Sequence, residues 1–181
     1  IIIDGFNAFE KYRESNKHKK NPYGHTYLIY RLAYGLIATY GLRPREVFNK
    51  PNIDWFLSEE NIDNTWKVHN DNKTGAREVL PFIPEWIELF DLKNKNSLEL
   101  LKLRTDKIKI SSQLTIIVDK NSQWFKRLEL GFKPYDLRHA CAIRAHLQGI
   151  PLKAAADNLG HSIEMHTKVY QKWFSLENRK K

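Results

Sequence analysis

The chain has 181 residues, enough for one globular domain with its own hydrophobic core. Hydrophobic residues make up 41% of it, which is too many for an intrinsically disordered chain. Lysine and arginine exceed aspartate and glutamate by nine charges (30 against 21), an excess that favours a polyanionic partner but is also found on ordinary solvated surfaces.

The cysteine content and the apolar runs exclude several other classes of protein. The single cysteine, Cys141, rules out an intramolecular disulfide, and its apolar surroundings indicate a small core residue in a reducing cytoplasm. No Cys/His cluster has the spacing of a zinc site. The most apolar run, 27–40, contains Arg31 and is too short to cross a bilayer, and no signal peptide is evident. Because the chain starts Ile-Ile-Ile, we expect a fragment or a trimmed product of a longer protein.

A basic linker followed by a long helix is predicted for the start of the chain. We interpret residues 1–21 as the end of a linker, because they begin apolar and turn basic before a proline. Its basic run, 17–20, is either solvated or faces phosphate. Apolar residues then recur at helical spacing from Ile29 to Tyr40, and Gly41 predicts the end of this helix.

The segment after Gly41 predicts a break and a second helix. Pro44 fits the first turn of that helix. Arg43 lies between the two predicted helices, and it either points back along the preceding helix or is a surface arginine.

A β-hairpin is predicted in the middle of the chain. The stretches 52–56 and 65–69 are short and rich in β-branched or aromatic residues, which predicts strands. The polar cluster 70–75 is typical of a turn, and 77–82 predicts the returning strand. Lys73 therefore lies at the tip of a hairpin, where the simplest interpretation is an exposed turn lysine.

The second half of the chain predicts mainly helices. They are expected at 86–92, 97–103, 122–130, 137–148 and from Pro151 to Gly160, followed by a last helix whose apolar stripe is Met165, Val169 and Trp173. Residues 105–118 are ambiguous, because their β-branched residues favour a strand whereas the family resemblance below favours a helix. The predicted fold class is mainly α with a small antiparallel β-sheet (α+β).

Arg43, Arg138, His161 and Tyr170 are the residues that we expect to lie around one phosphodiester. The planar donor fork of arginine neutralises phosphate and grips two of its oxygens, so two arginines can form a clamp. A tyrosine can attack in line and form a phosphotyrosine bond that is reversible. The departing 5′-oxygen needs a proton, which Lys73 on its hairpin can supply. His161 adds a further donor.

These motifs resemble those of the tyrosine recombinases, the phage-integrase family of site-specific DNA recombinases. Residues 38–46 resemble the first arginine box, 73–75 the catalytic-lysine turn, 137–140 the second arginine box, and 159–162 with Tyr170 the third box and the nucleophile. The resemblance covers roughly 23–174. It implies the integrase (DNA breaking-rejoining) fold, with a catalytic domain at 22–181 and the family's N-terminal core-binding domain absent.

The resemblance also implies a role for each residue. Arg43 and Arg138 would clamp the phosphate, and His161 would donate to it. Lys73 would be the general acid, and Tyr170 would form the 3′-phosphotyrosyl bond.

Three further positions take part in the resemblance. Glu46 and His139 would be structural supports, or His139 would contact the phosphate directly. Most members have a histidine three residues before the second arginine, whereas this chain has Tyr135 there, as some excision-type members do. We expect the Tyr135 hydroxyl to donate to the phosphate, because a phenol with a pKa of about 10 is a poor base at neutral pH.

The function implied by the resemblance is site-specific recombination. It implies an integrase or excisase of a mobile element that cleaves and rejoins double-stranded DNA without a metal, a cofactor or ATP. A tetramer of the full-length protein on DNA, in the cytoplasm at the nucleoid, is expected. Two alternatives stay open: a type IB topoisomerase-like enzyme, which shares the clamp and the nucleophile, and a catalytically impaired DNA-binding regulator, which Tyr135 favours.

Overall fold

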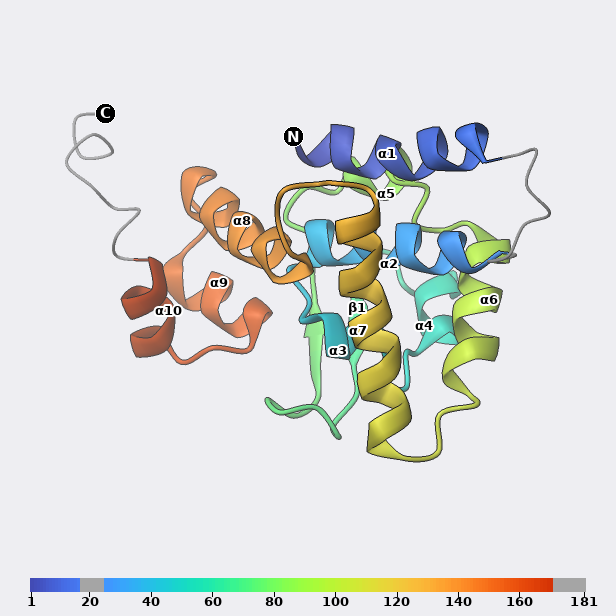
Figure 1. Ribbon diagram of the computed structural model, residues 1–181. Helices are drawn as coiled ribbons and strands as arrows, with labels where there is room; N and C mark the ends of the chain where they lie inside the picture. Colours follow the sequence, from blue (N-terminus) through green and yellow to red (C-terminus); the bar gives the residue numbers. More distant parts are fainter. Residues whose placement is uncertain (17–24, 171–181) are drawn as a thin grey trace.

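The computed structural model describes residues 1–16 and 25–170, although not the side chains of Val169 and Tyr170. The elements, shown in Figure 1, are α1 (Ile2–Ser15), α2 (Thr26–Tyr40), α3 (Pro44–Phe48), α4 (Ile53–Leu57), β1 (Trp66–Val68), β2 (Arg77–Val79), α5 (Trp86–Leu89), α6 (Lys95–Thr105), α7 (Ser111–Arg127), α8 (Pro134–Leu147), α9 (Leu152–Leu159) and α10 (Ile163–Tyr170). The fold class is confirmed: helices dominate, and β1 and β2 form a small antiparallel sheet with Trp66 opposite Val79.

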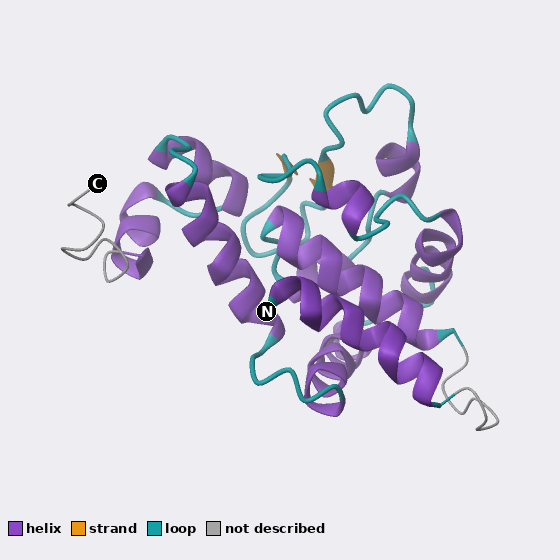
Figure 2. Cartoon of the chain, turned by 90° about the horizontal axis from the view of Figure 1, so that it is seen from above, coloured by secondary structure: helices purple, strands orange, loops and turns teal. Residues whose placement is uncertain are grey.

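Helix α2 is the centre of the core. Every residue from Ile29 to Tyr40 is buried except Arg31, so the helix is apolar nearly all round and must be enclosed by other elements. Helices α1, α6, α7 and α8 pack around it (Figure 1), and Figure 2 shows the mainly helical arrangement from above. The predicted end at Gly41 is confirmed, because this residue caps α2 in the left-handed conformation with φ +65°.

The first residues of the chain differ from the predicted linker. Residues 2–15 form α1, whose Phe6 and Phe9 are buried in the core. The two helices approach closely at Gly5, where a Cβ atom would lie 2.4 Å from the Tyr34 hydroxyl. That hydroxyl donates a 2.8 Å hydrogen bond to the carbonyl of Ile2. This part of the chain is therefore a packed helix, while 17–21 lies outside the described residues and the domain boundary stays a prediction.

One predicted strand is wrong and two are confirmed. Residues 52–56 lie mostly in α4, because the Asn52 side chain accepts a 3.0 Å hydrogen bond from the backbone N–H of Trp55 and caps the helix. The predictions at 65–69 and 77–82 correspond to β1 and β2, which are shorter than expected.

The ambiguous segment 105–118 is resolved as helix. It contains the end of α6 and the first half of α7. Its buried residues Leu114 and Ile117 continue to Asn121 and Trp124 at helical spacing, whereas the exposed Ile116 contributed to the strand signal. The helix predicted at 122–130 is thus the second half of a longer one.

Helices α8, α9 and α10 carry the end of the described chain and form the group at the left of Figure 1. Helix α8 packs on α2, and α9 packs on both α8 and β2. The predicted apolar stripe of the last helix fails at Met165, which is exposed, while His166 is buried. The side chain of Val169, and all of Trp173, lie outside the described residues. Within the described ranges, no helix is long and apolar enough to cross a membrane.

Candidate active site

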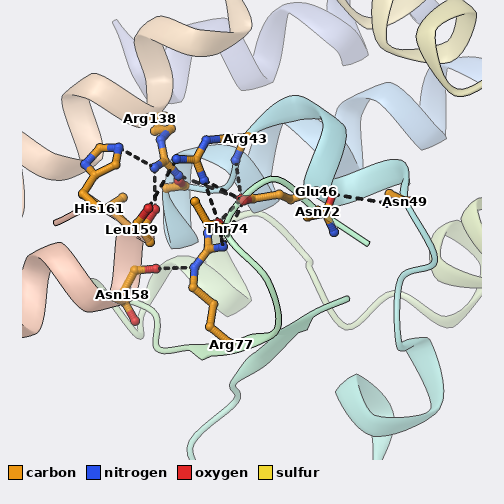
Figure 3. Close-up of polar contacts among 12 residues, drawn as sticks. Arg43, Glu46, Asn49, Asn72, Thr74, Arg77, Arg138, Asn158, Leu159 and His161 are labelled. Carbon is orange, nitrogen blue, oxygen red and sulfur yellow. Dashed lines mark hydrogen bonds and ion pairs between the residues drawn. The ribbon is translucent and has the colours of Figure 1, made fainter. Parts of the chain in front are cut away.

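The structure brings Arg43, Arg138 and His161 together from three separate parts of the chain (Figure 3). Arg43 caps the start of α3, Arg138 lies in α8, and His161 follows the end of α9. The contact between Arg138 Nη2 and His161 Nε2 is 2.9 Å, and Arg43 Nη2 lies 3.4 Å from the carbonyl of Gly160, the neighbour of His161. The predicted grouping of these residues is therefore present in space, whereas their roles stay predictions.

Arg138 is fully buried and is held by the ends of two helices. It donates to the carbonyl of Gly41 at the end of α2, at 2.5 Å, and to the carbonyl of Leu159 at the end of α9. Helix C-termini carry partial negative charge, so both ends stabilise the guanidinium. Burial and, next, the charge of Arg43 lower the pKa of Arg138 to about 10, with Glu46 opposing the shift. The group is still a cation at neutral pH.

Glu46 is a buried carboxylate shared by several arginines. Its Oε2 accepts from the backbone N–H of Arg43 and its Oε1 from Arg43 Nη1, both at 2.8 Å. Arg77 donates Nη1 to Oε1 at 2.9 Å and Nη2 to Oε2 at 2.8 Å. Burial would raise the pKa of Glu46, but the hydrogen bonds and charges of Arg77, Arg43 and Arg138 outweigh it and lower that pKa. This geometry fits the predicted supporting role.

His161 is neutral in this arrangement. Its Nε2 faces the guanidinium of Arg138, which can only donate, so the geometry assigns the proton to Nδ1. Burial, followed by the charges of Arg138 and Arg43, lowers the pKa of His161 to about 3. The ring of the buried His166, a residue that the sequence did not single out, lies 5.9 Å away between centroids.

The hairpin turn places Lys73 beside this group without burying it. Lys73 is exposed, and the hydroxyl of its neighbour Thr74 accepts from Arg43 Nη1 at 3.2 Å. The buried Asn72 side chain anchors the other side of the turn: it donates to the His69 carbonyl at 2.9 Å and accepts from Asn49 at 3.3 Å. Lys73 is thus held between two anchored residues.

Arg77 is a member of the cluster that sequence reasoning missed. Besides Glu46, it contacts the Thr74 hydroxyl through Nη1 at 3.0 Å and the Asn158 carbonyl through Nε at 3.0 Å. A signal was present, since Arg77 shares a strand face with Val79, and Val79 is fully buried. An arginine on the inner face of a strand needs a carboxylate or carbonyl partner.

Tyr135 and His139 form a pair next to the cluster. Tyr135 is 41% exposed in the first turn of α8, and its ring packs edge to face on His139 with centroids 5.0 Å apart. Tyr170 is the last residue of α10, the helix that follows His161 directly, and its side chain lies outside the described residues.

The side chains that the structure describes do not suggest a metal site. Across residues 1–16 and 25–168, no three histidine, cysteine, aspartate or glutamate side chains gather in a way that could hold a metal ion. The expectation of a reaction without metal or cofactor stays a prediction.

Comparison with known proteins gives two relatives in sequence and one in structure. The chain is 53% identical over 181 residues to Excisase C and 50% identical over 182 residues to Excisase A, both of Nostoc sp. strain PCC 7120. It is similar to the crystal structure of XerA recombinase, with a TM-score of 0.56 and 16% identity over 95% of this chain and 64% of that one. No protein-family model matches the chain.

These likenesses differ in what they establish. At 16% identity, the similarity to XerA recombinase shows a shared fold and no more. The excisase matches cover 99% of this chain but only 36% and 39% of the relatives, so the chain spans well under half of their length.

Proposed function

We propose that this chain is the catalytic part of a site-specific DNA recombinase of the tyrosine type, acting as an excisase or integrase. The observation that carries the proposal is the meeting of Arg43, Arg138 and His161 directly before the helix that bears Tyr170. High identity to two proteins named excisases and a fold shared with a recombinase support it.

In the proposed reaction, Arg43 and Arg138 form the phosphate clamp. Both guanidiniums are held by carbonyls and by Glu46 before any substrate is present. Donors fixed in this way need no reorganisation as negative charge grows on the non-bridging oxygens of the phosphate. The clamp therefore stabilises the transition state when Tyr170 attacks the phosphorus and the 5′-oxygen departs.

In this proposal His161 donates a hydrogen bond to the phosphate and Lys73 is the general acid. His161 is neutral while burial and the charges of Arg138 and Arg43 lower its pKa, and the negative charge that grows on the phosphate in the transition state would raise that pKa. It can then donate a hydrogen bond to a phosphate oxygen. Lys73, exposed and next in the chain to Thr74, which Arg43 contacts, protonates the departing 5′-oxygen. Tyr135, one helical turn before Arg138, adds a neutral donor.

The proposed partner is double-stranded DNA, with the longer protein assembling as a tetramer on it at the nucleoid. A catalytically impaired DNA-binding regulator is the second candidate, favoured by Tyr135 standing where a histidine base is expected. A type IB topoisomerase-like enzyme would also use the clamp, but it would relax a plasmid that carries no recombination site.

Covalent capture tests the proposal. A nicked suicide substrate should trap the chain on DNA as an adduct that resists denaturation, because the released fragment cannot religate. Tyr170→Phe should abolish the adduct but keep DNA binding, whereas Tyr27→Phe, at the start of α2, should leave it unchanged. An adduct that persists in Tyr170→Phe would assign the nucleophile elsewhere, and binding without any adduct in the parent chain would favour the regulator.

A further inference from the structure

The hydroxyl of Thr74 receives hydrogen bonds from two arginines that belong to different elements. Arg43 Nη1 lies 3.2 Å and Arg77 Nη1 3.0 Å from Thr74 Oγ1 (Figure 3). A hydroxyl oxygen has two lone pairs, so both are used. The same two guanidiniums also bind Glu46. We call Thr74, Arg43, Arg77 and Glu46 the latch.

The latch joins the hairpin turn to the two segments that carry the clamp and the histidine. Arg77 Nε donates to the Asn158 carbonyl near the end of α9, and Asn158 in turn bonds Leu80 after β2 through both its side-chain oxygen (2.8 Å) and nitrogen (3.0 Å). Arg43 reaches the Gly160 carbonyl beyond α9. The turn, α3 and the end of α9 therefore meet at a few hydrogen bonds.

Packing at Gly160 leaves little freedom for the latch to move. A Cβ atom at this position would lie 2.9 Å from Thr74 Oγ1 and 3.0 Å from Arg77 Cζ. The backbone that leads to His161 thus rests directly on Thr74 and Arg77. Displacing either side chain would disturb the contact between the turn and the His161 segment.

The internal bonds of the turn set its shape but not its place. Gly75 N–H donates to the Asn72 carbonyl at 2.9 Å, which closes the turn on itself. Lys73 is exposed, and its Cα is about 3.8 Å from that of Thr74 because the two are consecutive. Its place is set by outside contacts on both sides of Lys73: Asn49 holds Asn72, and Arg43 holds Thr74, the nearer neighbour to the clamp.

We propose that Thr74 and Arg77 are positioning residues that hold Lys73 at the phosphate clamp through the latch. The inference rests on the proposed function, in which Lys73 protonates the leaving 5′-oxygen. Without the Thr74 hydroxyl, Lys73 would still be present and charged, but its turn would no longer be tied to Arg43. The loss should therefore resemble a partial loss of the general acid.

The matched pair Thr74→Val and Thr74→Ser tests this idea with little risk to folding, because Thr74 is exposed. Valine has the shape of threonine without the hydroxyl, and serine keeps the hydroxyl. Single-turnover cleavage of a suicide substrate with a normal 5′-oxygen should fall about ten- to a hundred-fold in Thr74→Val, part of the roughly 10²–10⁴-fold that general acid catalysis supplies. Thr74→Ser should stay near the parent rate.

A substrate with a 5′-bridging sulfur separates positioning from a structural defect. A thiolate leaves without a proton, so this substrate should restore cleavage in Thr74→Val as it does in Lys73→Ala. Arg77→Met should behave in the same direction, with Arg104→Met on α6 as the control for lost charge. Equal losses on the oxygen and sulfur substrates would overturn the inference.

Hydrogen exchange of the turn gives a second readout that does not need cleavage. If the latch orders the turn, amides of residues 72–76 should exchange about three- to ten-fold faster in Thr74→Val than in Thr74→Ser, the effect expected from one lost hydrogen bond. An unchanged rate of amide exchange in Thr74→Val would refute the latch, whether or not the chain forms an adduct with DNA. An absent DNA adduct in the parent chain would count against the proposed function alone.

Discussion

Replacing Glu46 with glutamine should destabilise the protein strongly without changing the size of any side chain. Glu46 is 2% exposed and binds Arg43 and Arg77, with Arg138 Nη1 3.9 Å away. Glutamine keeps one acceptor oxygen and presents an amide N–H₂ where the second oxygen was. That group would face guanidinium N–H groups, donor against donor, and the cluster would lose its carboxylate charge.

The size of the effect follows from these contacts. Breaking a buried ion pair by removing one partner costs about 3–5 kcal/mol. Glutamine retains part of the hydrogen bonding, so we expect a loss of about 2–4 kcal/mol in the free energy of unfolding. For a domain of this size each kcal/mol shifts Tm by about 2–4 °C, which gives a decrease in Tm of about 4–16 °C.

The pH dependence supplies an independent check on this reasoning. The pKa of Glu46 is lowered from its usual value of 4.5 in the folded protein. A carboxylate of this kind contributes stability above its unfolded pKa and loses it as pH falls through the folded pKa. The difference in stability between parent and Glu46→Gln should therefore be full at pH 7 and shrink below about pH 4.

Thermal and urea unfolding at pH 7 measure the effect, with the exposed Glu59→Gln as the matched control. Sulfate should raise the Tm of Glu46→Gln more than that of the parent, because an anion bound at the arginines replaces the missing charge. A loss below about 1 kcal/mol, within the range of surface ion pairs, would refute the view that Glu46 neutralises the cluster.

Two further predictions concern His161 and Tyr135. Because the pKa of His161 is lowered to about 3, the folded state binds fewer protons than the unfolded state below pH 6.5, so stability should fall as pH drops from about 6.5 toward 3. His161→Gln should remove about 1 kcal/mol of the loss between pH 7 and pH 5 in urea unfolding, a figure discounted for partial exposure, and an identical slope in the variant would contradict the assignment. Tyr135→Phe should leave Tm unchanged but slow single-turnover cleavage about ten- to a hundred-fold, whereas Tyr135→His should retain activity and gain a pH dependence near 6–7. Cleavage by Tyr135→Phe at the parent rate would show that the ring only packs on His139.

The sequence predicted the elements of the fold best where a signal is local. Gly41 ends α2 because a glycine readily adopts φ +65°, and Pro44 starts α3. The strand prediction at 52–56 failed because a capping hydrogen bond, which the Asn52 side chain accepts from the Trp55 N–H, outweighed the β-branched and aromatic composition. Helix α1 was missed because its burial depends on the face of α2 that Phe6 and Phe9 cover, which no local pattern reveals.

The same distinction applies to the site. Arg43, Arg138 and His161 could be found from short motifs, and the structure places Arg138 in contact with His161 and Arg43 in contact with the carbonyl of the neighbouring Gly160. Thr74 and Arg77 could not be singled out in this way, because their importance depends on contacts with residues that are distant in sequence. Thr74 contacts Arg43, and Arg77 contacts Glu46 and Asn158. A polar residue on the inner face of a short strand was the only available indication.

The ends of two helices explain why the motifs contain glycines beside functional residues. Gly41 and Gly160 both cap a helix with positive φ, and the carbonyls of Gly41 and Leu159 both accept from Arg138. A Cβ atom at Gly41 would also lie 2.5 Å from Leu159 Cδ2, so the two ends can meet only if that position has no side chain. Arg138 is thereby held by two helix termini whose partial charges favour a cation. The sequence shows each helix end separately, whereas their convergence on one guanidinium is a property of the tertiary structure, and the guanidinium held in this way is the one that contacts His161 Nε2 at 2.9 Å.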